Sequence, residues 1–344
     1  MVPFAGWEMP VHYPAGIIAE HLHTRAQASL FDVCHMGEFF LSGPGALSDL
    51  SRLVTCRLDD LALGRCRYGF LTRENGTIMD DLIVFRLAEH EFMVVVNAAT
   101  RARDAEWIQA HLLPATAWRD GSDGLAKIDL QGPAAPAVMA RLIGAETVEA
   151  TRRFSFREVV IDEMKVQLSA TGYTGEPGYE LFHPVEEAVK LWDLLLRMEP
   201  VRPAGLGARD TLRLESGLPL YGHDLNDETT PLEANFARFV DFNKDFIGRE
   251  ALQRQEREGP RRLLTGLLCE GRRSAREGFE IIAAGRPVGA VTSAGFAPSL
   301  KRAIGMGYVE TEWAKIGQAV VLRGGAVEIP ATLEKLPVKV KGER

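Results

Sequence analysis

The sequence predicts an α+β protein that ends in a small β-barrel or β-sandwich. Up to about residue 258, segments with helical patterns alternate with apolar segments that are separated by hairpin-type turns. That mixture is typical of an α+β fold. After Gly259-Pro260, short apolar runs alternate with glycines, which indicates closely spaced strands. We expect a domain boundary at Gly259-Pro260, because this pair ends a helix.

Composition and charge exclude several classes of protein. A length of 344 residues suggests about two to three domains. The content of 46% hydrophobic and 25% charged residues is that of an ordinary globular protein. The net charge of −7 argues against non-specific nucleic-acid binding. No apolar run reaches the roughly 18 residues of a membrane span, and the first residues lack the pattern of a secretory signal. The four cysteines form no CxxC pair, so we expect free thiols in a reducing cytoplasm.

The elements before the boundary follow from apolar spacing and from the residues that end each segment. Gly-Pro pairs close strands, and prolines stop helices because they disfavour helical backbone in the preceding residue. In chain order we expect a helix at 17–29, a strand at 30–45, a helix at 45–54, strands on both sides of Asn75-Gly76, a strand at 91–100, a helix at 101–112, a strand at 125–133, a helix at 134–143, two strands around a glycine-rich loop within 164–184, a helix at 185–198, a helix from about Ala208, and a helix ending at Gly259-Pro260.

The segment ENGTIMDDLIVFRL at 74–87 places two aspartates inside a predicted strand. Asn75-Gly76 is a strong signal for a two-residue type I′ turn, which needs positive φ at both positions. Because side chains alternate along a strand, Asp80 and Asp81 are expected to point to opposite faces. One can then meet solvent, while the other faces whatever covers the sheet. Burying a lone carboxylate there costs free energy, unless the carboxylate has a binding partner or a role in catalysis.

The register of this hairpin predicts a cluster around Asp81. With Asn75-Gly76 as the loop, Tyr68 and Phe70 share a sheet face with Asp81. A five-residue connection at 87–91 would place Asn97 opposite Asp81. An aromatic wall with a few convergent polar groups is typical of a pocket for a flat heteroaromatic ligand. The alternative, in which both aspartates meet solvent on an edge strand, stays open from these residues alone.

Metal and dinucleotide sites are not expected. His21 and His23 stand at positions i and i+2 of a predicted helix and therefore face apart, which is a poor arrangement for a shared ion. The segment GLGARD at 205–210 lacks the third glycine of a dinucleotide-binding loop and opens no clear βαβ unit.

Several stretches together resemble the aminomethyltransferase family, the tetrahydrofolate-dependent T-protein of the glycine cleavage system. They occur in family order and cover nearly the whole chain. They are VPFAGWEMPVHY (2–13), HTRAQASLFDVCHMGE (23–38), ENGTIMDDLIV (74–84), MVVVNAAT, LQGP, TGYTGEPGYEL (171–181), RPAGLGARDTLRLESGLPLYGHDL (202–225), TTPLEANF, NKDFIGREAL and VGAVTSAGFAPSLKRAIGMGYV (288–309).

The resemblance implies a three-domain cloverleaf around a central folate cavity, with a C-terminal β-barrel. Residues 1–50 and 115–240 would form the folate-binding core. Residues 51–114 would form a second α+β domain that carries the Asp-Asp hairpin, and residues 260–344 would form the barrel.

The resemblance also implies an activity, a cofactor and a partner. The enzyme would transfer the one-carbon unit of an aminomethyl group on the lipoyl arm of the H-protein to tetrahydrofolate. The products would be ammonia, 5,10-methylenetetrahydrofolate and the dihydrolipoyl H-protein. Neither nucleic acid nor membrane is an expected partner.

Individual roles are implied where residues match the family's motifs. Asp81 matches the catalytic aspartate. Expulsion of ammonia passes through a cationic carbon, which a desolvated anion stabilises. We rank this electrostatic role above proton abstraction, because a carboxylate of ordinary pKa is a weak base at pH 7 unless burial raises its pKa.

Glu180 matches the family's pterin-binding glutamate. The chemistry fits this role, because one carboxylate can accept both N–H groups of a 2-amino-4-oxo pyrimidine. From alternation alone, a wet sheet face is the better interpretation of Glu180. Arg209 matches an arginine at the folate site; without the family, a solvated helix face is as good an interpretation. The remaining positions that match the cofactor's surroundings are Tyr68, Asn97, Tyr173 and Tyr221.

Two alternatives share the fold. One is a folate-dependent demethylase or methyltransferase that acts on a free small substrate. The other is a non-catalytic folate-binding protein of iron–sulfur cluster assembly. The second type carries a cysteine in a Lys-Gly-Cys-Tyr stretch, and the corresponding segment here, NKDFIGREAL, has none.

Overall fold

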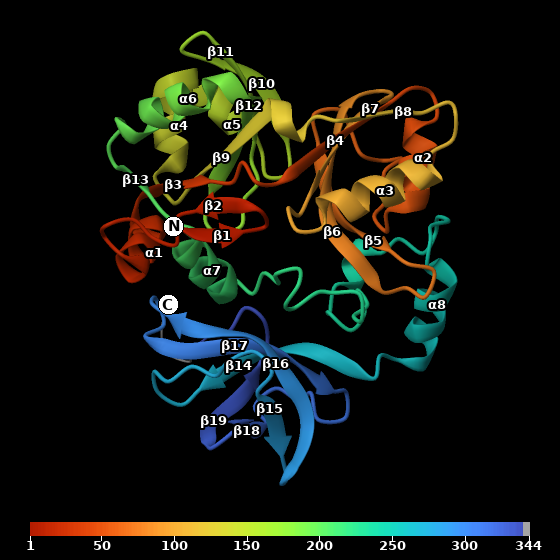
Figure 1. The fold of residues 1–344 in the computed structure, drawn as a ribbon, viewed down its shortest axis with the longest axis vertical. Coiled ribbons are helices and arrows are strands. Elements are labelled where there is room, and N and C mark those ends of the chain that lie inside the picture. Colours follow the sequence, from red (N-terminus) through yellow and green to blue (C-terminus); the bar gives the residue numbers. More distant parts are fainter. Residues whose placement is uncertain (340–344) are drawn as a thin grey trace. The chain divides into compact units, whose positions relative to one another are not determined.

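The computed structural model describes residues 1–339, which divide into two compact units (Figure 1). The first unit comprises Met1–Leu71, Asp80–Arg209 and Asn243–Phe246. The second comprises Thr72–Met79, Asp210–Phe242 and the chain from Ile247 onward. No helix among the described residues is long and apolar enough to cross a lipid bilayer.

The first unit contains two large sheets and a short hairpin. The six-stranded sheet has the order β10-β11-β12-β9-β3-β13, and the five-stranded sheet has the order β5-β6-β7-β4-β8. The strands of the first sheet are β3 (Ala28–Asp32), β9 (Leu125–Gln131), β10 (Phe156–Ile161), β11 (Met164–Ser169), β12 (Gly178–Pro184) and β13 (Val201–Pro203). Those of the second are β4 (Gly37–Ser42), β5 (Cys66–Thr72), β6 (Ile78–Ala88), β7 (Glu91–Val96) and β8 (Ala117–Asp120). The hairpin pairs β1 (Val2–Phe4) with β2 (Trp7–Met9).

Eight α-helices lie within residues 1–339. They are α1 (Ile17–Ala26), α2 (Ala46–Leu53), α3 (Arg101–His111), α4 (Ala135–Ile143), α5 (Ala145–Ala150), α6 (Ala188–Leu196), α7 (Leu206–Glu215) and α8 (Arg249–Glu258). Helices α4 and α6 pack against one face of the six-stranded sheet and bury its apolar side chains, such as Leu130 and Leu181. The polar residues of β9 and β12 therefore point to the opposite face.

The second unit contains a closed barrel in the order β14-β17-β16-β15-β18-β19. Its strands are β14 (Arg262–Cys269), β15 (Glu280–Ala283), β16 (Arg286–Ala297), β17 (Arg302–Glu310), β18 (Ala319–Gly324) and β19 (Val327–Glu334). Closure removes the exposed edges that short antiparallel strands would otherwise leave. The predicted α+β class and the small C-terminal barrel are confirmed, and the closed order decides between barrel and sandwich.

One predicted element was wrong. The expected strand at 30–45 is two strands, β3 and β4, which belong to different sheets. The Asp32 carboxylate accepts a hydrogen bond from the Cys34 N–H at 3.0 Å, so a side-chain turn ends β3. The chain then crosses to the five-stranded sheet.

The predicted domain ranges 1–50 with 115–240, 51–114 and 260–344 remain a proposal about folding units, as does the cloverleaf. The sheets cross the first of these boundaries. Strand β4 comes before residue 50 and β8 comes after residue 115, yet both pair in the sheet that contains β5, β6 and β7. The C-terminal barrel begins at Arg262, close to the boundary expected at Gly259-Pro260.

Candidate functional site

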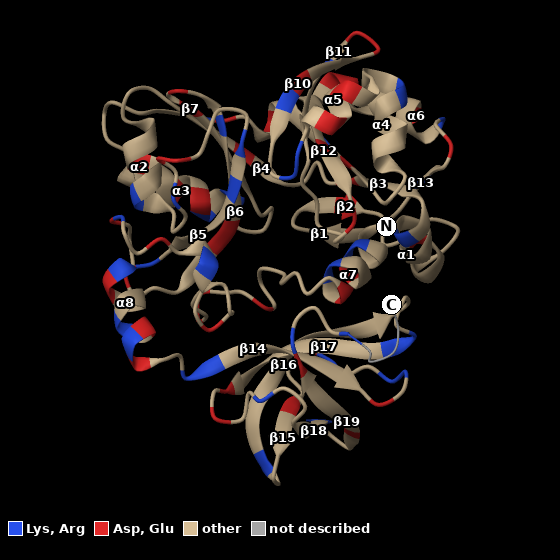
Figure 2. Cartoon of the chain, turned by 180° about the vertical axis from the view of Figure 1, so that it is seen from behind, with Lys and Arg blue, Asp and Glu red and all other residues tan. Residues whose placement is uncertain are grey.

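The two adjacent aspartates lie in β6, which runs between β5 and β7 and is therefore not an edge strand. Figure 2 shows acidic residues in the first half of this strand as well as on helices such as α8. The turn before β6 differs from the prediction. Gly76 donates to the Arg73 carbonyl at 2.9 Å, and Arg73 donates to the Thr77 carbonyl at 3.0 Å, so the loop has three residues and not two.

The physical reason lies in Asn75 and Gly76. Gly76 has a φ of 83°, whereas Asn75 keeps a negative φ and its side chain accepts hydrogen bonds from the N–H and hydroxyl of Thr77 at 3.1 and 2.8 Å. A type I′ turn needs positive φ at both positions, so a three-residue loop forms here. The register with β7 is the predicted one, but the predicted five-residue connection at 87–91 is wrong, because β6 continues to Ala88, which pairs with Glu91 after a register shift beyond Arg86. Ile83 pairs with Val95, and the same register places Asp81 opposite Asn97.

Asp81 is held by two side chains. The Tyr68 hydroxyl donates to Oδ2 at 2.9 Å, and the Asn97 amide donates to Oδ1 at 2.8 Å. The Tyr68 ring meets the buried Phe70 ring edge to face, with centroids 5.2 Å apart. The structure thus brings together the tyrosine, the phenylalanine, the carboxylate and the amide of the predicted cluster, although the two-residue loop assumed in predicting it does not form. Burial and the nearby Asp80 raise the pKa of Asp81 to about 7, although Tyr68 and Asn97 act in the opposite direction.

Asp80 does not meet solvent, contrary to the expectation for one member of the pair. It is 0% exposed and faces α3. Its carboxylate accepts hydrogen bonds from the backbone N–H of Asn97 at 3.0 Å, from the Asn97 amide at 2.8 Å and from the Thr100 hydroxyl at 2.8 Å. Burial, with the neighbouring Asp104, raises the pKa of Asp80 well above its ordinary value. Asn97 therefore bridges two acids with different environments.

Removing the Tyr68 hydroxyl should raise the pKa of Asp81. The hydroxyl stabilises the charged carboxylate, and a hydrogen bond to a charged group contributes about 1.5–3 kcal/mol, which corresponds to about one or two pKa units. In Tyr68→Phe we expect the Asp81 titration to move to higher pH by about one unit. Carboxyl-carbon NMR would measure it. Tyr179→Phe is the control, because Tyr179 belongs to the core between the six-stranded sheet and its helices. An unchanged titration in Tyr68→Phe would contradict the assignment.

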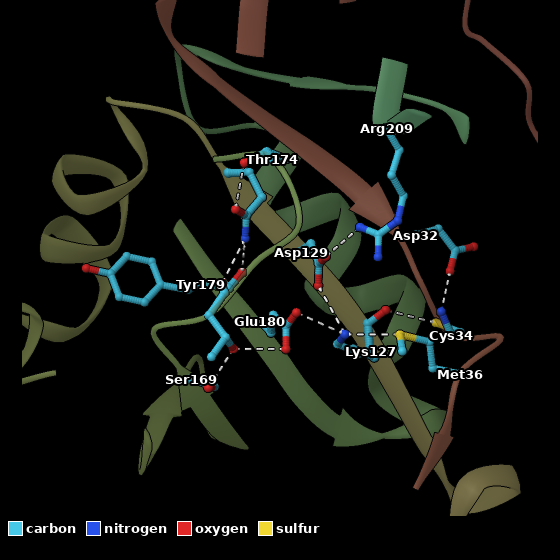
Figure 3. Close-up of polar contacts among 12 residues, drawn as sticks. Asp32, Cys34, Met36, Lys127, Asp129, Ser169, Thr174, Tyr179, Glu180 and Arg209 are labelled. Carbon is cyan, nitrogen blue, oxygen red and sulfur yellow. Dashed lines mark hydrogen bonds and ion pairs between the residues drawn. The ribbon is translucent and has the colours of Figure 1, made fainter. Parts of the chain in front are cut away.

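Glu180 lies in the middle of β12, where it pairs with Asp129 of β9 and Ser169 of β11. It is 4% exposed, so the alternative of a wet sheet face is wrong. One carboxylate oxygen lies 3.1 Å from the Lys127 ammonium (Figure 3). The other accepts from the Thr171 hydroxyl at 2.9 Å. The carboxylate is thus fixed at both oxygens while lone pairs remain for a further donor.

Glu180 is the end of a row of alternating charges. Lys127 lies 3.8 Å from Asp129, and Arg209 pairs with the other oxygen of Asp129 at 2.9 Å (Figure 3). The Arg209 guanidinium also lies over the Tyr173 ring, 5.0 Å from its centroid. The structure therefore joins Glu180, Arg209 and Tyr173 of the predicted residues in one network. The attraction between opposite charges at these distances offsets part of the desolvation free energy that burial of the charged side chains costs.

The face that carries Glu180 packs against the face that carries Asp81. Phe182 and Glu180 share one face of β12, and Phe85 and Asp81 share one face of β6, because each pair is an even number of residues apart. The Phe85 and Phe182 rings meet edge to face at 5.6 Å. The Asp81 cluster and the Glu180 row thus belong to the two sheet faces that meet inside the first unit.

Four polar residues of this region were not predicted: Lys127, Asp129, Asp80 and Glu38. Glu38 lies in the same cross-strand row as Val95 and Ile83 and is 2% exposed. Burial raises the pKa of Glu38 to about 8, although Lys127 and Arg101 act in the opposite direction. The sequence feature that could have pointed to Lys127 and Asp129 as site residues is their alternation with the apolar residues of 125–130. That pattern does not distinguish a wet sheet face from one covered by a second sheet.

Tyr221 is the one predicted site residue outside the first unit. It forms an isolated bridge with Leu225 in the second unit. Its role at the cofactor stays a prediction. Arg213, which shares α7 with Arg209, pairs with Asp210 at 2.8 Å and Asp224 at 2.7 Å, all within the second unit.

Comparisons with known proteins agree with this picture. The family profile of the GCVT N-terminal domain matches residues 1–244, and that of the glycine cleavage T-protein C-terminal barrel domain matches residues 261–339. An aminomethyltransferase of Symbiobacterium thermophilum is 40% identical over 344 residues, which cover 95% of this chain and 91% of the relative. One from Synechococcus elongatus is 41% identical, with 97% and 91% covered.

A solved structure is similar over the whole fold. The crystal structure of glycine cleavage system aminomethyltransferase T from Bartonella henselae superposes with a TM-score of 0.91 at 35% identity, and the match covers 98% of this chain and 93% of that one. The matches therefore extend over both sheets of the first unit and over the barrel. From its two family profiles and its full-length relatives, the chain belongs to the glycine cleavage T-protein family of aminomethyltransferases.

Proposed function

We propose that the chain transfers the one-carbon unit of an aminomethyl group from the lipoyl arm of the H-protein to tetrahydrofolate, with release of ammonia. The observation that carries the proposal is the pair of carboxylates, the partly buried Asp81 and the buried Glu180, on two sheet faces that meet, in a chain of this family. One carboxylate is suited to reaction chemistry and the other to recognition.

The residues present fit a pterin. Glu180 uses one oxygen toward Lys127 and the other toward Thr171, and a carboxylate has about four lone-pair positions. It can therefore still accept the two adjacent N–H groups of a 2-amino-4-oxo pyrimidine. Aromatic surface is supplied by Tyr68 and by Tyr173, the latter under the Arg209 guanidinium. When bound, tetrahydrofolate supplies the nitrogen that accepts the carbon.

Asp81 is suited to two tasks. As an anion it stabilises the positive charge that develops on the aminomethyl carbon as ammonia leaves. From the sequence, proton abstraction by Asp81 is ranked below electrostatic stabilisation, because a carboxylate of ordinary pKa is a weak base at pH 7. Burial removes that objection, since a pKa of about 7 leaves Asp81 able both to take up and to release a proton near neutral pH. Tyr68 and Asn97 fix its two oxygens in place.

The partner and the compartment are part of the proposal. The aminomethyl substrate is too reactive to be supplied as a stable free compound, which favours delivery on a carrier protein such as the lipoylated H-protein. The cysteines Cys34, Cys56, Cys66 and Cys269 are unpaired, which is typical of a reducing compartment. We therefore place the protein in the cytoplasm.

The test is to supply aminomethylated H-protein with tetrahydrofolate and to measure ammonia release. We expect release that depends on both components. H-protein without its lipoyl group is the matched control. Folate binding without ammonia release would favour the non-catalytic iron–sulfur assembly protein. Turnover of free methylated thioethers or aryl ethers in place of the H-protein substrate would favour the demethylase or methyltransferase.

A further inference from the structure

Lys127 lies at the centre of the buried row of charges (Figure 3). Its side chain is 3% exposed, which is rare for lysine unless the ammonium is paired. Burial lowers the pKa of Lys127, but the carboxylates of Asp129 and Glu180 outweigh that effect and raise the pKa above its ordinary value. The side chain is therefore a permanent cation at neutral pH, fixed beside Glu180.

The hydrogen-bonding capacity of this cation is only partly used. Its nitrogen lies 3.1 Å from Glu180 Oε1, and it donates to the Met36 sulfur at 3.3 Å, which is a weak acceptor. Asp129 Oδ1 lies at 3.8 Å, beyond hydrogen-bond distance, and has no hydrogen-bond partner among residues 1–339. Because buried polar groups are nearly always hydrogen-bonded, the row has unused capacity for a ligand.

We infer that Lys127 is a specificity-determining residue that, together with Glu180, selects a 2-amino-4-oxo pterin over a 2,4-diaminopteridine. This inference rests on the proposed binding of tetrahydrofolate. The edge of a 2-amino-4-oxo pterin presents two donors, the 2-amino group and N3–H, followed by one acceptor, the 4-oxo oxygen. Glu180 supplies two acceptors, and the adjacent ammonium supplies a donor.

A 4-amino group reverses the last two elements of this pattern, because N3 of the neutral diamino ring carries no hydrogen and the 4-amino group is a donor. It places a donor against the Lys127 ammonium, and protonation of the diamino ring adds a like charge. The mismatch leaves buried polar groups without partners, which is the arrangement that discriminates most strongly between similar ligands. A row without Lys127 would lose the part of this discrimination that comes from position 4, whereas Glu180 would still disfavour an N3 that carries no hydrogen.

Folic acid and aminopterin form a matched pair of probes, because they differ only at position 4 of the pteridine and in the N3 hydrogen that accompanies the 4-oxo group. Their affinities would be measured by calorimetry, or by competition with tetrahydrofolate, on the wild type and on Lys127→Met. We expect the wild type to bind folic acid about 10–100-fold more tightly than aminopterin. In Lys127→Met we expect the ratio to fall by about 5–10-fold, mainly through weaker binding of folic acid, because the lost hydrogen bond is the one to the 4-oxo oxygen.

Lys190→Met is the control variant, because Lys190 is an exposed lysine paired with Asp162, and it should keep the wild-type ratio. Circular dichroism would check folding. If Lys127→Met does not fold, Lys127→Gln keeps a donor and should retain preference for the 4-oxo ring. A ratio near one in the wild type, or a wild-type ratio in a folded Lys127→Met, would overturn the inference. Failure of the wild type to bind tetrahydrofolate at all would instead overturn the proposed function.

Discussion

Asp81→Asn should lower turnover by about 10²–10⁴-fold while tetrahydrofolate still binds. Asparagine keeps the shape of the side chain and can still meet Tyr68 and Asn97, but it removes both the negative charge and the basic oxygen. The interactions lost are those that strengthen as ammonia leaves. The effect should therefore appear in kcat, measured as ammonia release with saturating aminomethylated H-protein, and not in the dissociation constant for tetrahydrofolate.

The pH dependence of folding gives an independent check on Asp81. Its folded-state pKa of about 7 lies above the value of an unfolded aspartate, so its contribution to stability is complete below the unfolded pKa and is lost as the pH rises through about 7. Asp81→Asn removes this loss. Its free energy of unfolding should fall less than that of the wild type between about pH 4 and pH 8.

Asp162→Asn is the matched control, since Asp162 is an exposed carboxylate in the turn between β10 and β11. It should leave both turnover and the pH profile of stability unchanged. Wild-type turnover in Asp81→Asn would remove Asp81 from the chemistry. A large loss of tetrahydrofolate affinity in the same variant would show that its main role is binding.

The contrast between Asp80 and Asp81 shows what the sequence can and cannot specify. Alternation along a strand correctly separates the two carboxylates, and the register correctly places Asn97 opposite Asp81. Alternation does not say whether each face is covered. Here α3 covers the face of Asp80, which is 0% exposed, whereas the face of Asp81 packs against the six-stranded sheet and Asp81 itself remains partly exposed. Long-range packing decides this, and no local pattern records it.

The same limit explains why Lys127 and Asp129 were missed. Their strand alternates polar and apolar residues as an amphipathic strand with one wet face does. The segment from 30 to 45 was misjudged for a related reason, since an apolar run does not reveal that a short turn at Asp32 divides it between two sheets. The barrel was easier to predict from the sequence, because each of its short strands is bounded by glycine-containing turns that can be recognised locally.

Glu180→Ala should weaken tetrahydrofolate binding by about 2–4 kcal/mol, which is about 30–1000-fold. The variant loses two charge-assisted hydrogen bonds to the pterin, each worth about 1.5–3 kcal/mol before relaxation. It also removes the oxygen that lies 3.1 Å from Lys127, so the ammonium keeps Asp129 at 3.8 Å and the weakly accepting Met36 sulfur at 3.3 Å. Leaving a buried charge without its partner is strongly destabilising, and we expect a lower melting temperature as well.

These two effects must be separated, because an unstable protein also binds poorly. Glu180→Gln keeps the volume and one acceptor, so it should fold better than Glu180→Ala and still lose affinity. Glu158→Gln is the control in the same sheet, where Glu158 is exposed on β10. Calorimetry at a temperature well below every melting point then reports affinity alone. A dissociation constant of Glu180→Gln and Glu180→Ala within twofold of the wild type would contradict pterin recognition by Glu180.

A double-variant comparison shows whether Glu180 binds the ligand directly or only holds Lys127. If its sole role is to neutralise Lys127, then removing both charges should restore much of the lost affinity, because no unpaired ion remains. If Glu180 accepts the pterin N–H groups, Glu180→Gln combined with Lys127→Met should bind no better than Glu180→Gln alone. We expect the second result, because the carboxylate fixed by Lys127 and Thr171 still has lone pairs free for two donors.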